Sequence, residues 1–218
     1  MQESSSSRSA RPRSPGRPRT FDRTEALETA LRIFWKLGYE PASVSTICKA
    51  IGIAPPSFYA AFGSKAELFL EAVRHYEAAY WTGLLKEMEG SDKPLAQSIA
   101  AFFDQAAGVL LNPETPNGCM VVLAAVNVGP RETEVVSVLK NLRLETRNYF
   151  KRRLERAQLE GELSGDADVE ALADALNIFL EGMSIQARDG LSLEALRKAA
   201  SPIVNLFAGL SAAGAQSG

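Results

Sequence analysis

Apolar residues recur with a helical spacing between residues 43 and 51. Four of them fall at i, i+3, i+4 and i+7 and so share one face of a helix: Val44, Ile47, Cys48 and Ile51. Ser43 precedes the first of them and can cap the helix with its hydroxyl, whereas Gly52 can adopt the left-handed conformation that ends a helix. The pattern predicts a helix of about two turns.

A second short helix follows directly after this glycine. Pro55 and Pro56 suit a first helical turn, where a backbone N–H is not needed, and Phe58 and Phe62 are spaced i, i+4 on the inward face. The outward face carries small or uncharged residues, namely Pro55, Pro56, Ser57, Tyr59 and Ala60. Two short helices joined by a glycine turn are typical of a helix-turn-helix unit, whose second helix enters the DNA major groove.

The rest of the chain also has helical periodicity, and no alternating run indicates a strand. Asp22 and Glu25 resemble a capping box and start a helix that ends at Gly38, and Ser64 and Glu67 start another that we expect to continue to Gly90. Further helices are expected at about 92–110, 119–128, 130–160, 166–188 and 192–210. The sequence therefore predicts an all-α protein of about nine helices.

The last two predicted helices carry more apolar residues than a single core requires. On the first, one apolar face holds Leu172 and Leu176 and another holds Phe179; on the second, Ile203 and Phe207 recur. A surplus of this kind suggests that both helices contribute to a symmetric four-helix dimer interface, formed by Leu172, Leu176, Phe179, Ile203 and Phe207.

Charge is distributed unevenly along the chain. The net charge of the 218 residues is −2, but residues 8–65 hold ten Lys/Arg against four Asp/Glu, and residues 66–218 hold 14 against 21. A polyanion would be attracted to the N-terminal part and repelled by the rest. The alternative is that the basic segment is only a solvated tail, but this would not explain why it adjoins the helix-turn-helix pattern.

Three stretches carry a resemblance to a known family: GRPRTFD at 16–22, ALRIFWKLGYEPAS at 30–43 and AIGIAPPSFYAAFGSKAELF at 50–69. Together they resemble the DNA-binding domain of TetR/AcrR transcriptional regulators, and Gly118-Cys119-Met120 resembles a segment found in one subgroup. Ala54 departs from the pattern, because members of the family usually have Ser or Thr at this helix cap.

The resemblance implies a domain organisation and a function. We expect a disordered tail at 1–15, a helix-turn-helix DNA-binding domain with an N-terminal arm at 16–65, a helical effector-binding and dimerisation domain at 66–212, and a flexible end at 213–218. The protein would be a homodimeric repressor that binds a palindromic operator and is released by a small, largely apolar ligand. The other interpretations are a DNA-binding protein without an effector, one that responds to oxidation at Cys119, and a helical enzyme or carrier that retains the N-terminal domain.

The predicted contacts with DNA follow from the residue types on the exposed surface. The segment from 54 to 62 has no Arg, Asn or Gln, so it cannot make the bidentate contacts that read guanine or adenine. We expect Pro55, Pro56 and Ala60 to contact thymine methyl groups and the other residues to grip the backbone, with an arm in the minor groove. The predicted DNA-binding residues are Arg17, Arg19, Ser43, Ser45, Thr46, Pro55, Pro56, Ser57, Tyr59 and Lys65. The resemblance implies that Lys65 contacts a DNA phosphate, as the matching lysine does in the family.

A ligand pocket is expected between the helices of the second domain. Its candidate walls are Trp81, Phe102, Phe103, Met120, Phe150, Phe179 and Met183, with Asn127, Asn177 or Gln186 as polar groups. For each of these residues, ordinary core packing is the alternative. Cys119 is expected to be a buried packing residue, since free cysteines usually are.

Catalytic chemistry finds no support in the sequence. His75 is the only histidine, no P-loop or zinc motif occurs, and the two cysteines, Cys48 and Cys119, lie far apart. We therefore expect no enzyme activity and no cofactor, with double-stranded DNA, a second copy of the chain and a small molecule as the partners and no membrane. No apolar segment near the N-terminus resembles a signal peptide, so a cytoplasmic location is expected.

Overall fold

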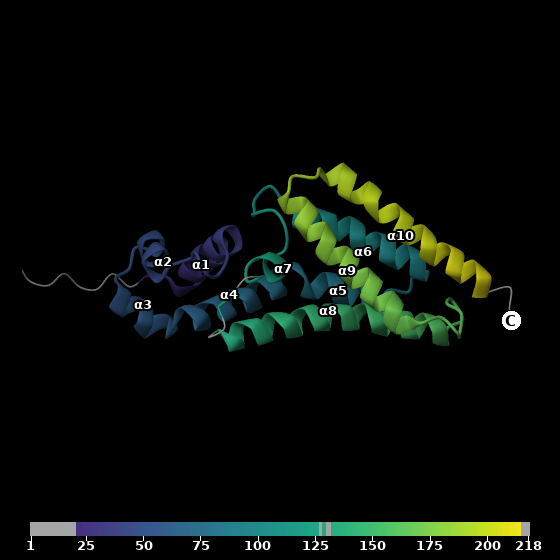
Figure 1. Cartoon of the computed structure of the whole chain (residues 1–218), viewed down its shortest axis with the longest axis horizontal. Coiled ribbons are helices and arrows are strands. Elements are labelled where there is room, and N and C mark those ends of the chain that lie inside the picture. Colours follow the sequence, from purple (N-terminus) through teal and green to yellow (C-terminus); the bar gives the residue numbers. More distant parts are fainter. Residues whose placement is uncertain (1–20, 127, 130–131, 215–218) are drawn as a thin grey trace, which may run out of the picture.

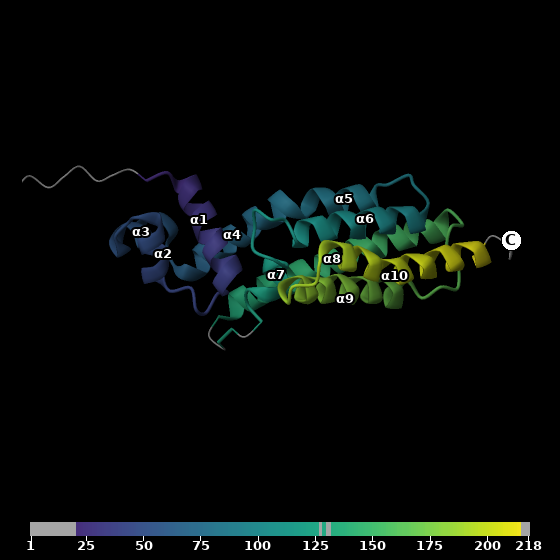
Figure 2. The same ribbon diagram turned by 90° about the horizontal axis from the view of Figure 1, so that it is seen from above.

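The computed structural model describes residues 21–126, 128–129 and 132–214, and this part of the chain is all-helical. Ten helices follow one another: α1 (Arg23–Leu37), α2 (Val44–Ile51), α3 (Pro55–Phe62), α4 (Lys65–Tyr80), α5 (Thr82–Glu89), α6 (Leu95–Leu110), α7 (Met120–Leu123), α8 (Thr133–Leu159), α9 (Val169–Arg188) and α10 (Leu193–Gly214). The molecule is elongated, with α1–α3 at one end and the C-terminal end of α10 at the other (Figures 1 and 2). The predicted fold class is confirmed.

The N-terminal domain packs α1 to α3 against the first half of α4. Asp22 caps α1 by accepting hydrogen bonds from the N–H groups of Thr24 and Glu25, at 2.8 and 3.1 Å. Buried Phe34 of α1 meets Phe69 of α4 edge to face, with ring centroids 5.0 Å apart. Because α4 extends from this core into the second domain, it connects the two (Figure 1).

The expected single helix from Ser64 to Gly90 is wrong, because the chain breaks at Trp81. Its φ of −117° lies outside the helical range and separates α4 from α5. At this break the buried indole Nε1–H donates to the Tyr76 hydroxyl over 2.7 Å, and the Thr82 hydroxyl donates to the Glu77 carbonyl. Because this break divides one expected helix into two, the described residues form ten helices and not the nine that were expected.

The expected helix from 119 to 128 is also wrong in length, since only Met120–Leu123 is helical. The carbonyl of Ala124 accepts a hydrogen bond from the backbone N–H of Tyr39 over 2.6 Å, which gives this carbonyl a partner outside the segment. Val126, beyond the end of this short helix, is 69% exposed, and Asn127 lies outside the described residues.

The C-terminal domain is built from α5, α6, α8, α9 and α10, with α10 packed on α6 and α8 packed on α9 (Figure 2). Four phenylalanines from three helices join in its core: Phe102 and Phe103 of α6, Phe150 of α8 and Phe179 of α9. None of the helices in the described ranges is long and apolar enough to cross a membrane.

The end of this domain far from α1–α3 is held by a buried cation. Arg153 of α8 is only 1% exposed, and its Nη2 donates to the Lys93 carbonyl over 2.9 Å and to Glu162 Oε1 over 3.1 Å. The same carboxylate accepts the N–H of Leu95, the first residue of α6. A buried charge-assisted pair is costly to break, so these contacts fix the loops that flank α6 and α8.

Candidate DNA-binding surface and C-terminal cavity

The turn between α2 and α3 has the geometry predicted from its sequence. Ser43 Oγ accepts the N–H of Thr46 over 3.0 Å and so caps α2, while Gly52 takes the left-handed conformation (φ 79°, ψ 30°) that ends it. Ala54 gives α3 no side-chain cap, as expected from its missing hydroxyl.

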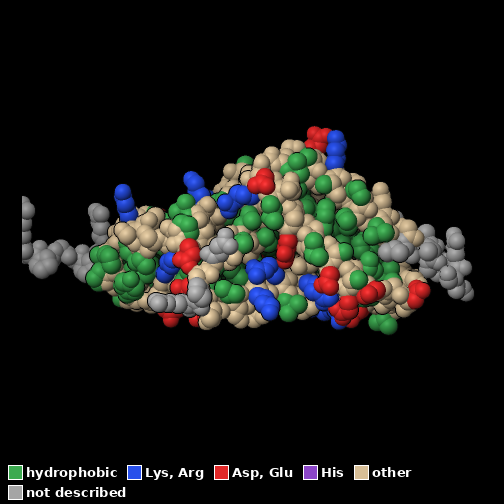
Figure 3. All heavy atoms as spheres, viewed as in Figure 1, with side chains coloured by type: hydrophobic (Ala, Val, Ile, Leu, Met, Phe, Trp, Pro, Cys, Tyr) green, Lys and Arg blue, Asp and Glu red, His purple; other side chains and the backbone are tan. Residues whose placement is uncertain are grey.

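Helix α3 presents a nearly uncharged surface to solvent. Phe58 and Phe62 are buried, whereas Tyr59 is 52% exposed. The other predicted contacts on these two helices are also exposed, and they are Ser43, Ser45, Thr46, Pro55, Pro56 and Ser57. Apolar side chains gather at this end of the molecule in Figure 3. All of these predicted DNA contacts are therefore accessible to solvent.

Lys65 is held more firmly than the sequence suggested. Its Nζ donates to the Tyr39 carbonyl over 3.0 Å and lies 4.1 Å from the centre of the Tyr39 ring, so its ammonium is not free in solution. Arg17 and Arg19 lie outside the described residues.

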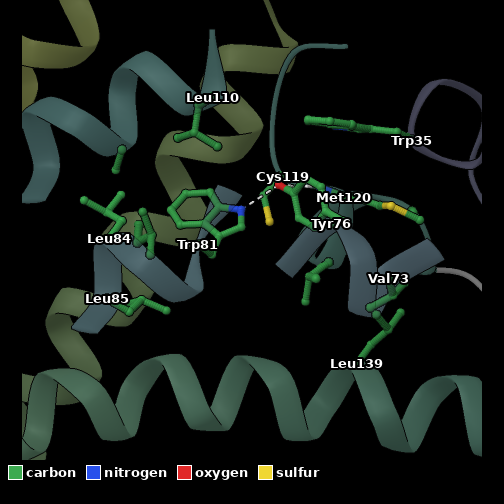
Figure 4. Close-up of a cluster of buried hydrophobic side chains, with 14 of the residues drawn as sticks. Trp35, Val73, Tyr76, Trp81, Leu84, Leu85, Leu110, Cys119, Met120 and Leu139 are labelled. Carbon is green, nitrogen blue, oxygen red and sulfur yellow. Dashed lines mark hydrogen bonds between the residues drawn. The ribbon is translucent and has the colours of Figure 1, made fainter. Parts of the chain in front are cut away.

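A cavity opens in the second domain where the end of α4 meets α6, α7, α8 and α9. Its volume is about 30 Å³, and the whole hollow together with the open solvent at its mouth holds about 380 Å³. The lining is apolar from Trp81, Leu110, Val121, Val122 and Leu180, and polar from Glu77, Cys119, Arg143, Thr146, Asn177 and Glu181. Figure 4 shows Trp81, Leu110 and Cys119 converging here.

The expected pocket walls are mostly core residues. Of the seven, only Trp81 lines this cavity, and Asn177 is the one expected polar group that does so; Gln186 is exposed on α9. The four phenylalanines pack against one another, with centroid distances of 5.1–6.1 Å, although Phe102 also borders a smaller hollow beside α5. Met120 and Met183 are fully buried in packing. Aromatic side chains pack well against one another, so the four phenylalanines form part of the core and other side chains line the cavity.

Sequence reasoning missed the ionisable residues of the cavity. Glu77, Arg143 and Glu181 lie on helices rich in charged residues, so nothing in the pattern separates them from solvent-facing positions. Burial raises the pKa of Glu77 to about 7 and that of the Cys119 thiol to about 11. Cys119 is therefore a buried thiol, in agreement with the packing role expected for it. Among the described residues, no cluster of His, Cys, Asp and Glu can hold a metal ion.

The segment 118–124, which contains α7, contacts both the cavity and the N-terminal domain. Cys119 and Val121 line the cavity, and the Cys119 N–H donates to Ser184 Oγ of α9 over 2.7 Å. On its other side, the Gly118 carbonyl accepts from the indole of Trp35 in α1 over 2.8 Å. Arg188 of α9 donates to the Trp35 carbonyl over 3.1 Å. The hydrogen bonds that link the two domains here are therefore accepted by backbone carbonyl groups, those of Gly118 and Trp35.

The predicted dimer residues are divided between the core and the surface. Leu176 and Phe207 are buried within the chain, while Leu172, Phe179 and Ile203 are partly buried. Among the described side chains of α9 and α10, the large exposed apolar ones are Ile178, Ile185 and Leu206, with Ile178 at 69% exposure. Figure 3 shows apolar side chains over these two helices. None of the five predicted dimer residues is fully exposed within one chain.

Comparison with known proteins agrees with this architecture. Residues 26–72 match the family model for bacterial regulatory proteins of the tetR family, and residues 95–201 match the tetracyclin repressor-like C-terminal domain. The HTH-type transcriptional repressor ComR of Escherichia coli K12 is 31% identical over 195 residues, covering 89% of this chain and 93% of that protein. The repressor BdcR of the same organism is 30% identical, covering 84% and 88%.

A solved structure extends the similarity to three dimensions. A cysteine mutant of the TetR family regulator CifR, complexed with 26-base-pair operator DNA, superposes with a TM-score of 0.81 and 36% identity, covering 87% of this chain and 98% of that one. The matched models and relatives span both domains, and the relatives are transcriptional regulators. The chain belongs to the TetR family of DNA-binding transcriptional regulators.

Proposed function

We propose that the protein is a homodimeric repressor that binds a palindromic operator and releases it when a small, largely apolar molecule occupies the C-terminal cavity. The observation that carries the proposal is the position of segment 118–124. One side of it lines the cavity, and the other is hydrogen-bonded to Trp35 and Tyr39 of the DNA-binding domain.

A ligand that widens the cavity would displace this segment. The Tyr39 N–H donates to the Ala124 carbonyl, and the Tyr39 carbonyl accepts a hydrogen bond from the Lys65 ammonium. Displacement of segment 118–124 would therefore shift the end of α1 and the start of α4 together. The energy available for release is the difference in ligand affinity between the two conformations.

Dimerisation would use the outer faces of α9 and α10. Ile178, Ile185 and Leu206 expose apolar surface that a second copy would cover in a four-helix arrangement. A twofold dimer would place two copies of α3 in successive major grooves, about 34–36 Å apart. Replacing Ile178 with Glu should yield a monomer in sedimentation analysis, whereas the matched change Leu159→Glu, at a 90% exposed site ending α8, should leave the dimer intact. If the Ile178→Glu variant remains dimeric, as the Leu159→Glu control does, the proposed interface is wrong.

The function itself is tested by selecting bound fragments from genomic DNA at moderate salt. We expect a palindromic site that the wild type enriches and a variant with Tyr59→Ala and Lys65→Ala does not. Only diffuse, salt-sensitive binding would support an effector-independent DNA-binding protein instead.

Oxidation at Cys119 is the second candidate signal, because its side chain lines the cavity and the CifR structure is described as a cysteine mutant. The raised thiol pKa opposes this, since the thiolate is the reactive form. Peroxide that lowers operator affinity in the wild type but not in Cys119→Ser would support the redox signal; equal responses would exclude it.

A further inference from the structure

The cavity contains a buried hydrogen-bond acceptor that lacks a donor. The Asn177 amide Nδ2 donates to Glu181 Oε1 over 3.0 Å, and because a carboxylate only accepts, this contact fixes the orientation of the amide. Its Oδ1 is buried, and no group in the described ranges donates to it. Both residues line the cavity. A buried acceptor without a donor is unfavourable, because nothing replaces the hydrogen bond to water that it has lost.

Glu77 places a second acceptor in the same cavity. Its carboxyl group has no hydrogen bond or ion pair with any residue described, and burial raises its pKa to about 7. Glu77 is only partly buried, so its carboxyl group keeps some contact with solvent, but no protein donor compensates for the water that it has lost.

Two donor-bearing side chains also line the cavity, and each has one hydrogen bond to a backbone carbonyl, whereas the remaining N–H groups of Arg143 have no protein partner in the described ranges. Arg143 Nη1 donates to the Val121 carbonyl over 3.0 Å, and the Thr146 hydroxyl donates to the Leu142 carbonyl over 3.2 Å. The site thus has two carboxyl groups and one free amide oxygen, with the guanidinium held against α7. A ligand that brings donors complements it better than one that brings acceptors.

We propose that the effector is a short apolar molecule bearing a hydroxyl or ammonium group, which donates hydrogen bonds to Glu77 and to Asn177 Oδ1. Its apolar part would contact Trp81, Leu110 and Leu180, which line the same cavity. This inference rests on the proposed function, since it names the chemistry of the molecule that releases DNA.

Size limits the molecule further. The cavity volume of about 30 Å³ is small, whereas the whole hollow with the open solvent at its mouth holds about 380 Å³, so a ligand of a few carbon atoms fits and a longer one would protrude into solvent. Probes with four carbon atoms are therefore suitable. 1-Butanol and n-butylamine carry donors, whereas methyl propyl ether is close in size to 1-butanol but carries none, and butyrate is an anion.

The experiment is a titration of the full-length protein followed by NMR. We expect 1-butanol and n-butylamine to bind at least about tenfold more tightly than the ether, the loss expected when a buried acceptor stays unpaired. Butyrate should bind more weakly than either donor. Equal affinity for 1-butanol and the ether, tighter binding of butyrate, or no saturable binding of either donor would overturn the proposal.

Substitutions of Asn177 and Glu77 test whether these two acceptors cause the preference for ligands with donor groups. Asn177→Leu should reduce the preference for 1-butanol over the ether, while Asn205→Leu, an exposed asparagine on α10 outside this cavity, should not. Glu77→Gln should weaken n-butylamine about tenfold and 1-butanol about twofold at most. If Asn177→Leu does not fold, Asn177→Asp, which keeps an acceptor oxygen, should retain n-butylamine binding. Unchanged preferences in both Asn177→Leu and Glu77→Gln would refute the assignment.

Operator binding measured with the same probes separates this inference from the proposed function. Donor-selective binding without loss of DNA affinity would leave the ligand chemistry intact and contradict ligand-induced release. Release of DNA by probes without donors would support the regulator and contradict the ligand chemistry.

Discussion

Replacing Gly118 with alanine should destabilise the protein more than an ordinary glycine substitution. Gly118 has a φ of 84°, where a non-glycine residue is disfavoured by about 1 kcal/mol. A Cβ atom would also lie 2.4 Å from Leu123 Cδ1 and 2.8 Å from the Ser184 carbonyl oxygen. The leucine methyl can rotate away, but the carbonyl belongs to the backbone of α9, so the segment itself must move.

The magnitude follows from these two contributions. Overpacking of this kind typically costs about 1–3 kcal/mol, which gives a total of about 2–4 kcal/mol. Gly161→Ala is the matched control, because its φ of 76° imposes the same conformational cost and no atom lies within 4 Å of the added Cβ. Gly118→Ala should therefore exceed it by about 1–3 kcal/mol.

Thermal unfolding at equal protein concentration measures the difference. For a chain of this size each kcal/mol lowers the midpoint by about 2–4 °C, so Gly118→Ala should melt about 2–12 °C below Gly161→Ala. Equal midpoints would show that segment 118–124 is not packed tightly against α9, and would remove the main support for coupling between the domains.

Three further outcomes are expected. Ser43→Ala removes the cap of α2 and should cost about 1 kcal/mol, whereas Ala54→Ser supplies the missing cap of α3 and should raise the melting temperature. Burial raises the folded-state pKa of Glu77 from 4.5 to about 7, so its proton stabilises the folded state at low pH. The free energy of unfolding should therefore fall as pH rises from about 4.5 through 7. Denaturant titrations at several pH values should show that Glu77→Gln flattens this dependence, by about 3 kcal/mol at most. Tyr59→Phe should weaken binding to all DNA sequences alike, and a changed preference at one base pair in a fragment selection would contradict its role as a backbone contact.

Local signals explain why the helix-turn-helix unit could be predicted from the sequence. The cap at Ser43, the stop at Gly52 and the pair Phe58 and Phe62 depend only on neighbouring residues, and the structure has all of them as expected. The break at Trp81 depends instead on a contact between its indole and Tyr76, and continuous helical periodicity gave no sign of it.

The cavity was less accessible to sequence reasoning for a related reason. An apolar stripe does not reveal which of its members pack together, so Phe103 and Phe150 were assigned to a pocket although they stack in the core. Conversely, Arg143 and Glu77 lie on helices with many charged residues, and only the tertiary arrangement directs them toward the cavity.

The buried Arg153 has a mechanical consequence for the whole molecule. It clamps α8 near its C-terminal end, whereas the residue just before the other end, Glu132, accepts a hydrogen bond from the Tyr39 hydroxyl over 2.8 Å. A helix of 27 residues is about 40 Å long. Arg153 lies 20 residues from Thr133, about 30 Å along the helix, so a tilt of about 5° around the clamp would swing the Tyr39 end by about 2.6 Å. Helix α8 can thus act as a lever with a fixed pivot, which amplifies a small angular change into a displacement large enough to misalign a DNA-binding domain.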